Sequence, residues 1–231
     1  VEILKEMNIQ FYIINRMSIF EIRKMLKNLE PNFIHAHDFK ASCVCAMSTF
    51  KIPIVSHLHN NCPWLKKLHP YSFIYLLCSK NIKKILTVSN SIEEEYIFSK
   101  IIKNKITCIG NPVSTRKILN RVDFKNKKIK YDICCVARIT EQKNPYKFIR
   151  IISKIKDLYP NIRCVWVGTG TLEDKIKKYC REKNVEKIIK FVGFQKNPYE
   201  FMNSSKIFML TSDWEGFGLV AFEALTLGLP C

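Results

Sequence analysis

Short apolar runs recur along the first half of the chain, with helical patterns between them. These runs are Phe11–Ile14, Phe33-Ile34, Ile52–Val55 and Ile85–Val88. Short runs that are apolar at almost every position are typical of buried parallel strands. Between the first two, a Ser18-x-x-Glu21 capping box opens a helical pattern that ends before Pro31. The pattern therefore predicts a repeating unit of strand, helix and strand.

A second series of strands follows a basic segment, residues 125–130, that has no apolar face. Its predicted strands are Ile133–Ala137, Cys164–Val167, Ile189–Val192 and Ile207–Leu210. The helices between them are predicted to start at Asn144-Pro145, Thr171-x-x-Asp174 and Asn197-Pro198. We therefore predict an α/β fold with two doubly wound parallel-sheet domains, residues 1–115 and 129–231, joined by a linker at 116–128.

The composition supports a folded protein with an anionic partner. Hydrophobic residues make up 47% of the 231 residues, which excludes a disordered tail or a low-complexity linker. A net charge of +18 favours nucleic acid, an acidic membrane surface or a phosphorylated substrate. Lysines scattered over solvated faces are the alternative explanation of this charge. The chain carries no nucleic-acid recognition motif, so we expect no nucleic acid among its partners.

The cysteines and the apolar runs indicate the cellular compartment. Ten cysteines occur without a Cys-x-x-Cys motif, mostly in apolar runs, so we expect reduced thiols and no zinc site. No apolar stretch approaches the roughly 20 residues that cross a bilayer. The first residues do not have the pattern of a signal peptide. The sequence thus predicts a cytoplasmic location.

Polar and glycine-rich segments follow the predicted strands. They include His35–Asp38, His57–Asn60, Arg138–Lys143, Gly168-Thr-Gly170 and Ser212–Gly216. Ligands of parallel α/β sheets bind beyond the carboxyl ends of the strands. These segments are therefore the candidate functional loops.

Two glutamates, Glu215 and Glu223, bracket the start of the last predicted helix. Gly216 and Gly218 leave backbone N–H groups uncovered there, which predicts an anion site suited to a phosphate. The two carboxylates are suitable acceptors for the hydroxyl groups of a sugar and a ribose. The alternative is that Glu215 only complements the helix dipole and that Glu223 is a solvated helix residue.

Two cations follow the first strand of the second series. Arg138 and Lys143 come at the start of a helix, where together they suit a diphosphate, although loop cations are commonly just solvated. Gly168-Thr-Gly170 permits a close backbone approach. It lacks the remaining glycine of a dinucleotide fingerprint and the Lys-Ser/Thr of a P-loop, so P-loop chemistry is disfavoured.

The order and spacing of these motifs resemble the retaining glycosyltransferases of family 4, which have a GT-B fold of two Rossmann-like domains facing a cleft. The matching segments cover almost the whole chain: His37-Asp38, Pro53–His59, Thr87-Val-Ser89, Gly110–Val113, Arg138 with Gln142-Lys143-Asn144, Gly168–Gly170, Phe191–Gly193 and Glu215–Pro230. Ala137 departs from the glycine that the family often has before the arginine. Family members carry further elements at both ends, so we expect an internal fragment of a protein of roughly 350–400 residues, with both domains truncated.

The resemblance also implies roles for individual residues. It implies catalytic roles for His59 and Glu215, and an acceptor-side position for His37 and Asp38. It implies donor contacts for Arg138, Lys143, Gly168, Gly170, Gly216, Phe217, Gly218, Leu219 and Glu223. A histidine satisfied by a backbone carbonyl is the alternative for His37 and His59.

The resemblance implies transfer of a hexose-type sugar, with retention of configuration, from a nucleotide-sugar to a glycan or lipid-linked acceptor in bacterial surface polysaccharide synthesis. No Asp-x-Asp motif occurs, and Asp213-Trp-Glu215 fits the sugar site better than a metal, so we expect neither a metal nor another cofactor. A non-catalytic nucleotide-sugar-binding protein of the same fold is the alternative.

The segment Trp64–Leu77 mixes aromatic and aliphatic residues with lysines, and Lys80, Lys83 and Lys84 follow it. Such a segment is suited to peripheral docking on the anionic inner face of the cell membrane. An ordinary core helix with a basic rim is the alternative interpretation.

Overall fold

A computed structural model describes residues 2–125 and 127–231, which form two compact units divided between Gly110 and Asn111. Val1 and Asn126, which fall in the predicted first domain and linker, lie outside the described residues. The fold is the predicted one in class, with two parallel sheets and helices between their strands.

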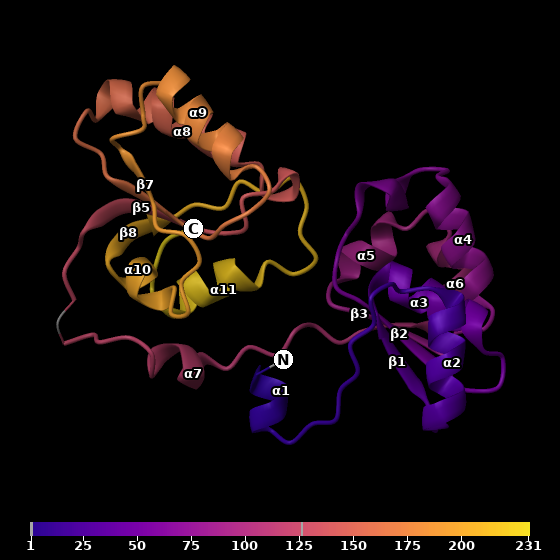
Figure 1. The fold of residues 1–231 in the computed structure, drawn as a ribbon. Coiled ribbons are helices and arrows are strands. Elements are labelled where there is room, and N and C mark those ends of the chain that lie inside the picture. Colours follow the sequence, from indigo (N-terminus) through magenta and orange to yellow (C-terminus); the bar gives the residue numbers. More distant parts are fainter. Residues whose placement is uncertain (1, 126) are drawn as a thin grey trace. The chain divides into compact units, whose positions relative to one another are not determined.

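The first unit contains one four-stranded parallel sheet in the order β1-β2-β3-β4 (Figure 1). Its strands are β1 (Ile34–His37), β2 (Ile54–Leu58), β3 (Lys84–Thr87) and β4 (Ile106–Cys108). Its helices are α1 (Glu2–Glu6), α2 (Ile19–Leu29), α3 (Asp38–Ser48), α4 (Pro70–Ser79), α5 (Asn90–Glu95) and α6 (Ser99–Ile102), with short 3₁₀ turns at η1 (Pro63–Lys66) and η2 (Lys103–Lys105). The helix α2 begins at Ser18, whose Oγ accepts the N–H of Glu21 as the capping pattern predicts.

The core of this unit lies on one face of its sheet, because its strand order runs in one direction and right-handed crossovers then place the connecting helices on the same side. Ile54 and Ile85 are fully buried against helices α3, α4 and α5. A buried hydroxyl chain joins Ser42 of α3, Ser56 of β2 and Tyr75 of α4 through hydrogen bonds of 2.7 and 2.9 Å. These bonds satisfy polar groups that would otherwise be costly to bury.

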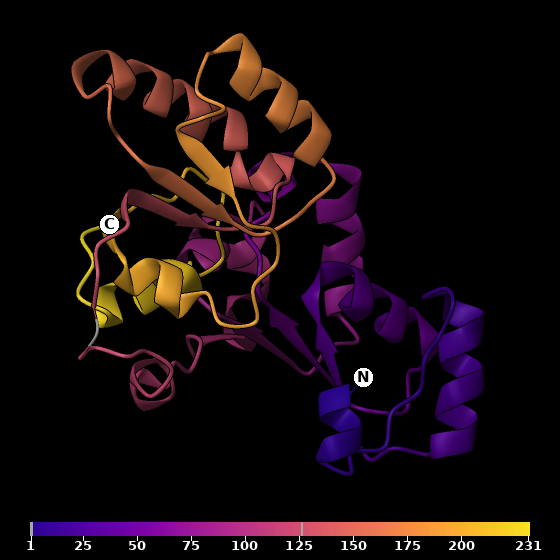
Figure 2. The same ribbon diagram turned by 60° about the vertical axis from the view of Figure 1, so that its left-hand side comes forward.

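The second unit contains a doubly wound sheet in the order β7-β6-β5-β8. Its strands are β5 (Tyr131–Val136), β6 (Cys164–Val167), β7 (Ile189–Phe191) and β8 (Ser205–Phe208). Its helices are α7 (Thr115–Leu119), α8 (Pro145–Leu158), α9 (Glu173–Glu182), α10 (Tyr199–Asn203) and α11 (Leu219–Thr226), with a 3₁₀ turn at η3 (Glu141–Lys143). Helices α8 and α9 cover one face of the sheet and α10 and α11 cover the other (Figures 1 and 2).

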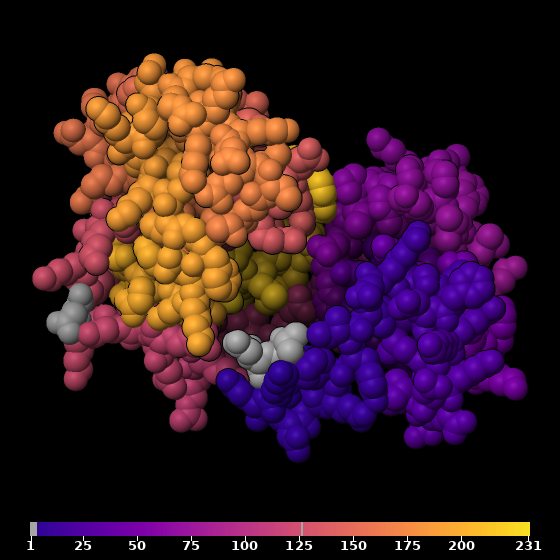
Figure 3. All heavy atoms as spheres, in the orientation of Figure 1, coloured from indigo at the N-terminus to yellow at the C-terminus, as the bar shows by residue number. Residues whose placement is uncertain are grey.

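Each face of the second sheet has its own apolar core. Phe148 and Trp166 are fully buried on the side of α8 and α9, with their rings edge to face at 5.1 Å between centroids. Phe208 and Met202 are buried on the side of α10 and α11. The helix α9 buries Ile176 and turns its charged residues outward, where its orange atoms form part of the surface in Figure 3.

The helix starts of the second unit follow the predicted caps only in part. Asn144 caps α8 as predicted, with its Oδ1 accepting the N–H of Lys147 at 3.0 Å. Thr171 does not cap α9, which begins after Leu172. Asn197 instead donates its side-chain N–H to the carbonyl of Arg121 at 2.8 Å, and α10 begins after Pro198. A tertiary partner thus replaces the local cap at Asn197.

Two sequence-based expectations about the first unit differ from the structure. The predicted strand Phe11–Ile14 is neither strand nor helix, and its Ile13 is 75% exposed. An apolar run becomes a strand only where a neighbouring strand can complete its hydrogen bonds. The strand β4 was not predicted, because its short sequence Ile-Thr-Cys has no distinctive apolar pattern.

The segment expected to be a linker is partly structured. Helix α7 packs against α11, and its Ile118 is buried in the core on that side. Residues from Asn111 onward therefore belong to the second unit. Among the described residues, no helix combines the length and the apolar character needed to cross a membrane.

Candidate functional site

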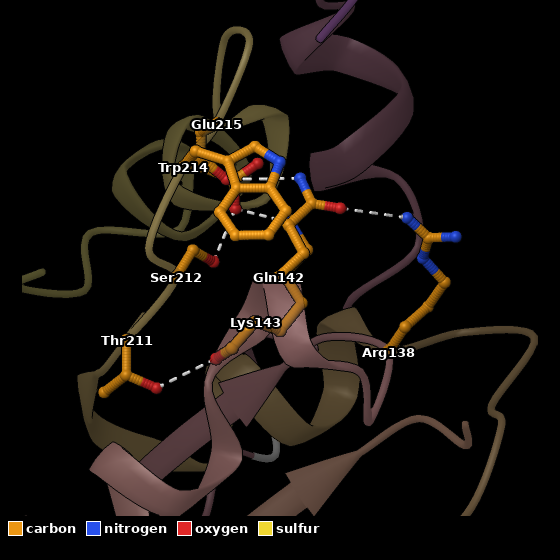
Figure 4. A network of polar contacts seen from close by, with 7 residues as sticks. All are labelled: Arg138, Gln142, Lys143, Thr211, Ser212, Trp214 and Glu215. Atoms are coloured by element: carbon orange, nitrogen blue, oxygen red, sulfur yellow. Dashed lines mark hydrogen bonds and ion pairs between the residues drawn. The ribbon is translucent and has the colours of Figure 1, made fainter. Parts of the chain in front are cut away.

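The two loops at the switch point of the second sheet meet in space. One loop follows β5 and contains η3, and the other follows β8 and leads into α11. The strand β5 pairs with β6 on one side and with β8 on the other, so the order of the strands reverses there. Open parallel sheets bind their ligands at such a point. Figure 4 shows side chains of both loops turned toward one another.

A lysine and a glutamate join these loops. Lys143 Nζ donates to Glu215 Oε1 and forms an ion pair with it, and the two side chains are only 13% and 26% exposed. Ser212 Oγ donates to the same carboxylate oxygen at 2.6 Å. Partial burial protects this ion pair from screening by salt. The structure thus brings together two of the predicted site residues, and it adds Ser212, for which the sequence predicted no role.

Further hydrogen bonds hold the two loops in a single arrangement. The N–H of Asp213 donates to the carbonyl of Gln142 at 2.9 Å, and Gln142 Nε2 donates to the carbonyl of Trp214 at 3.1 Å. Asn144 Nδ2 donates to Asp213 Oδ1 at 2.9 Å. Asp213 is therefore part of the framework that positions Lys143 and Glu215.

Arg138 lies at the edge of the same network (Figure 4). Its Nη2 is 3.4 Å from Gln142 Oε1, which is a long and weak hydrogen bond, and its side chain is exposed. The guanidinium is therefore held only loosely, and its donors face solvent.

The N-terminus of α11 adjoins this network. Gly218 caps the helix with φ of 72°, a left-handed conformation that glycine adopts without strain, and no side chain caps the first N–H groups. The Ala221 N–H donates to the Gly218 carbonyl at 2.9 Å, whereas the N–H groups before it have no acceptor one turn back in the helix. Phe217 and Leu219 beside them are 38% and 42% exposed. The helix end thus retains donors suited to an anion.

Glu223 lies on α11 and contacts α10 rather than the two switch-point loops. Tyr199 OH donates to Glu223 Oε1 at 3.1 Å, and the Arg121 guanidinium lies 6.0 Å from the centre of the Tyr199 ring. Burial raises the pKa of Glu223, while the Tyr199 hydrogen bond and the Arg121 charge act in the opposite direction. Tyr199 and Arg121 were missed by the sequence analysis, because no motif links them to Glu223.

The two glycines after β6 approach the chain's own backbone. A Cβ atom on Gly168 would lie 2.1 Å from the Ala137 carbonyl oxygen, and one on Gly170 would lie 2.2 Å from that of Ile139. Gly168 also has φ of 134°. These glycines therefore allow the loops after β5 and β6 to pack together, which is a structural reason for the close approach that the sequence predicted.

In the first unit, three more predicted residues lie together where β1 and β2 end. The rings of His37 and His59 share a hydrogen bond of 2.8 Å between Nδ1 and Nε2. Asp38 Oδ1 accepts the backbone N–H of His59 at 3.0 Å. Asp38 also borders a pocket of about 570 Å³ whose lining is mainly apolar and includes Phe39 and Trp64.

Comparison with known proteins agrees with this architecture. The family model described as "Glycosyltransferase Family 4" matches residues 6–117, and the model described as "Glycosyl transferases group 1" matches residues 117–231. The chain is 27% identical, over 91% of its length, to the uncharacterized glycosyltransferase MJ1059 of Methanocaldococcus jannaschii, and it covers 57% of that protein. It is 26% identical, over 93% of its length, to the UDP-Gal:alpha-D-GlcNAc-diphosphoundecaprenol alpha-1,3-galactosyltransferase of Escherichia coli, of which it covers 60%.

The fold also matches solved structures. Anabaena Alr3699/HepE in complex with UDP-glucose aligns with a TM-score of 0.80 at 17% identity, over 99% of this chain and 68% of that one. The apo form of the lipopolysaccharide outer core galactosyltransferase WaaB aligns with a TM-score of 0.60 at 22% identity, over 92% of this chain and 59% of that one. The chain spans about three fifths of the length of the two curated relatives, MJ1059 and the Escherichia coli galactosyltransferase. Because the two family models match in sequence order and together cover residues 6–231, which form two parallel sheets, the chain belongs to the family 4 glycosyltransferases of the GT-B fold.

Proposed function

We propose that this chain carries the donor and acceptor sites of a retaining glycosyltransferase that moves a hexose-type sugar from a nucleoside diphosphate to a glycan or lipid-linked acceptor. The observation that carries the proposal is the Lys143–Glu215 ion pair at the switch point, beside the N-terminus of α11, where Gly218 is the N-cap residue and provides no side-chain cap. A cation, a carboxylate and exposed N–H groups in one place match the chemistry of a sugar diphosphate.

The donor site has positive charge where a diphosphate needs it. Lys143, Arg138 and the N–H groups at Gly216–Gly218 are the groups that we assign to the phosphates. Phosphate oxygens then compete with Glu215 for Lys143, and the Glu215 carboxylate is released to accept hydrogen bonds from the sugar hydroxyls. Glu223 is assigned to the ribose hydroxyls.

The departing diphosphate accumulates negative charge as the bond to the sugar breaks. Cations and helix N–H groups that are already in position stabilise that charge at little cost in reorganisation. The proposed transfer therefore needs no bound metal. In the proposed reaction the acceptor hydroxyl attacks from the side of the leaving group, so the anomeric configuration is retained, and we assign His59 to the sugar near the reacting carbon.

The acceptor is assigned to the first unit, where His37 and Asp38 lie beside the mainly apolar pocket. An apolar pocket next to a carboxylate suits an acceptor that combines hydroxyl groups with an apolar part. The names of two relatives give related chemistry: a galactosyltransferase acting on a diphosphoundecaprenol acceptor, and a lipopolysaccharide 1,6-galactosyltransferase of Escherichia coli. We therefore propose a role in bacterial surface polysaccharide synthesis at the inner face of the cell membrane.

The test is a calorimetric binding panel of UDP-, GDP-, ADP- and CMP-sugars on the 231-residue chain. We expect one nucleotide class to bind, with Lys143→Ala and Glu223→Ala each weakening the affinity at least about tenfold, the cost of losing one charged hydrogen bond. Lys147→Ala is the matched control, because this exposed lysine lies only four residues further on, in the first turn of α8.

Release of free sugar from the bound donor separates an enzyme from a non-catalytic binding protein. Slow donor hydrolysis that Glu215→Gln abolishes supports the transferase. Donor binding without any hydrolysis favours the binding protein instead. A folded chain that binds no nucleotide-sugar contradicts both.

A further inference from the structure

Four of the five histidines of the chain gather on one face of the first sheet. His35 and His37 are two residues apart on β1, and His57 and His59 are two residues apart at the end of β2, so each pair points to one face. The parallel register places His37 beside His57. The ring centroid of His57 lies 5.3, 5.4 and 4.1 Å from those of His35, His37 and His59.

The ring of His57 lacks a polar partner within the described part of the chain. It is 91% buried, since its exposed fraction is 9%, and neither ring nitrogen has a hydrogen-bond partner there. A buried polar group without a hydrogen-bond partner destabilises the folded state. Both ring nitrogens of His57 are therefore available to a ligand that can bind them.

We propose that His35, His37 and His57 form a binding site for a divalent transition-metal ion of the Zn²⁺ or Ni²⁺ type. One ring nitrogen from each residue forms a set whose members all lie within 4.8 Å of one another. Imidazole nitrogen suits Zn²⁺, Ni²⁺ and Cu²⁺, whereas Mg²⁺ and Ca²⁺ prefer oxygen ligands. Three histidine ligands leave one position of a tetrahedral ion open.

The neighbouring side chains support this assignment. The hydrogen bond to His59 occupies Nδ1 of His37 and orients its ring, as partners of metal-binding histidines commonly do.

Closing the site around an ion requires only small movements. Zn–N bonds of about 2.0–2.1 Å place two ligand nitrogens roughly 3.4 Å apart in a tetrahedral site, so nitrogens that lie within 4.8 Å of one another must approach by at most about 1.4 Å. His35 and His37 are exposed and able to make this movement. The expectation of no zinc site rested on the spacing of the cysteines, and it did not consider histidines from two separate strands.

The metal site shares His37 with the proposed acceptor side, whereas His35 and His57 have no role in the proposed sugar transfer, so variants of these two residues test metal binding separately. The test is a titration of the reduced 231-residue chain with CoCl₂, followed by displacement with ZnCl₂ and by thermal unfolding with and without ZnCl₂. We expect about one equivalent of Co²⁺ with visible ligand-field bands, and a higher melting temperature with Zn²⁺. His35→Ala and His57→Gln each weaken binding at least about tenfold.

His69→Asn is the matched control, because His69 is the remaining histidine and caps α4, a role that asparagine can keep. The His35 variant changes an exposed side chain, so it keeps the test decisive if the His57 variant fails to fold. Binding that survives both substitutions, or a near-ultraviolet thiolate-to-cobalt band, overturns the proposal, as does the absence of binding by the folded chain.

Discussion

At the scale of single residues, Glu223 shows how burial and a tyrosine set the behaviour of a carboxyl group. Its side chain is partly buried beside Tyr199, and burial is the main reason for its raised pKa. The folded chain therefore binds the proton of Glu223 more tightly than the unfolded chain does. Ionisation of Glu223 costs stability as the pH rises from the ordinary pKa of glutamate through the raised value.

The loss of stability with rising pH gives a testable prediction for Glu223→Gln. Glutamine keeps an acceptor for Tyr199 and carries no charge, so we expect the variant to melt a few degrees higher than the native chain near pH 7. The advantage should vanish below about pH 4, where the unfolded and folded carboxyls are both protonated. Thermal melting across this pH range is the measurement. Glu94→Gln, at an exposed position, is the control. An advantage of equal size at both ends of the range would contradict the argument.

At the scale of the elements, the loops after β5 and β6 depend on a very close approach of two backbones. The N–H of Gly168 donates to the carbonyl of Gly193 at 2.7 Å, while its Cα faces the carbonyl of Ala137. The same carbonyl accepts Trp166 Nε1 at 2.9 Å. These contacts fix the position from which Arg138 begins the switch-point loop.

Gly168→Ala is therefore expected to destabilise the second unit by more than about 3 kcal/mol, because the new Cβ would collide with rigid backbone at a strained φ. Gly228→Ala is the matched control, with φ of 75° and open space around the Cβ, and should cost only about 1 kcal/mol. Urea unfolding followed by far-ultraviolet circular dichroism measures both. Equal costs for the two variants would show that the close approach is unimportant.

At the scale of the whole molecule, the charge of +18 is combined with an exposed apolar surface on α4. Tyr71, Ile74 and Leu77 lie one turn apart on this helix and are 59%, 41% and 63% exposed. The adjacent Lys66 is paired with Glu95 at 2.7 Å, while Lys67 is exposed. An apolar stripe with nearby cations is suited to an anionic membrane surface.

We therefore expect the chain to bind anionic liposomes, and to bind them less well as salt is added. Lys67→Glu should weaken this binding several-fold, since each basic residue near such a surface contributes about 1 kcal/mol. Lys154→Glu, an equal change of charge on the exposed face of α8, is the control and should have a smaller effect. Liposome co-sedimentation is the measurement. Salt-insensitive binding, or equal effects of the two substitutions, would contradict membrane docking through α4.

Much of the fold was predictable because parallel strands and amphipathic helices have local signatures. Buried strands such as Cys164–Val167 are apolar at every position, and Asn144-Pro145 caps α8 through a contact three residues away. The run Phe11–Ile14 has a strand-like composition but no pairing partner in the structure. Composition alone cannot distinguish these two situations, because strand pairing is a long-range property.

The candidate site also combines features that the local sequence predicts with features that depend on the tertiary structure. Arg138, Lys143, Glu215 and the glycines near α11 were recognisable from the sequence, because each lies in a loop that follows a strand, where this fold class binds its ligands. The contact of Lys143 with Glu215 joins residues 72 positions apart. The Tyr199 partner of Glu223 and the four-histidine cluster also arise from separate elements. Local chemistry therefore specified the strands, the caps and the chemical character of each loop. The pairing of charges, the burial that shifts their pKa values and the gathering of histidines across two strands depended on long-range packing, which no short segment of sequence encodes.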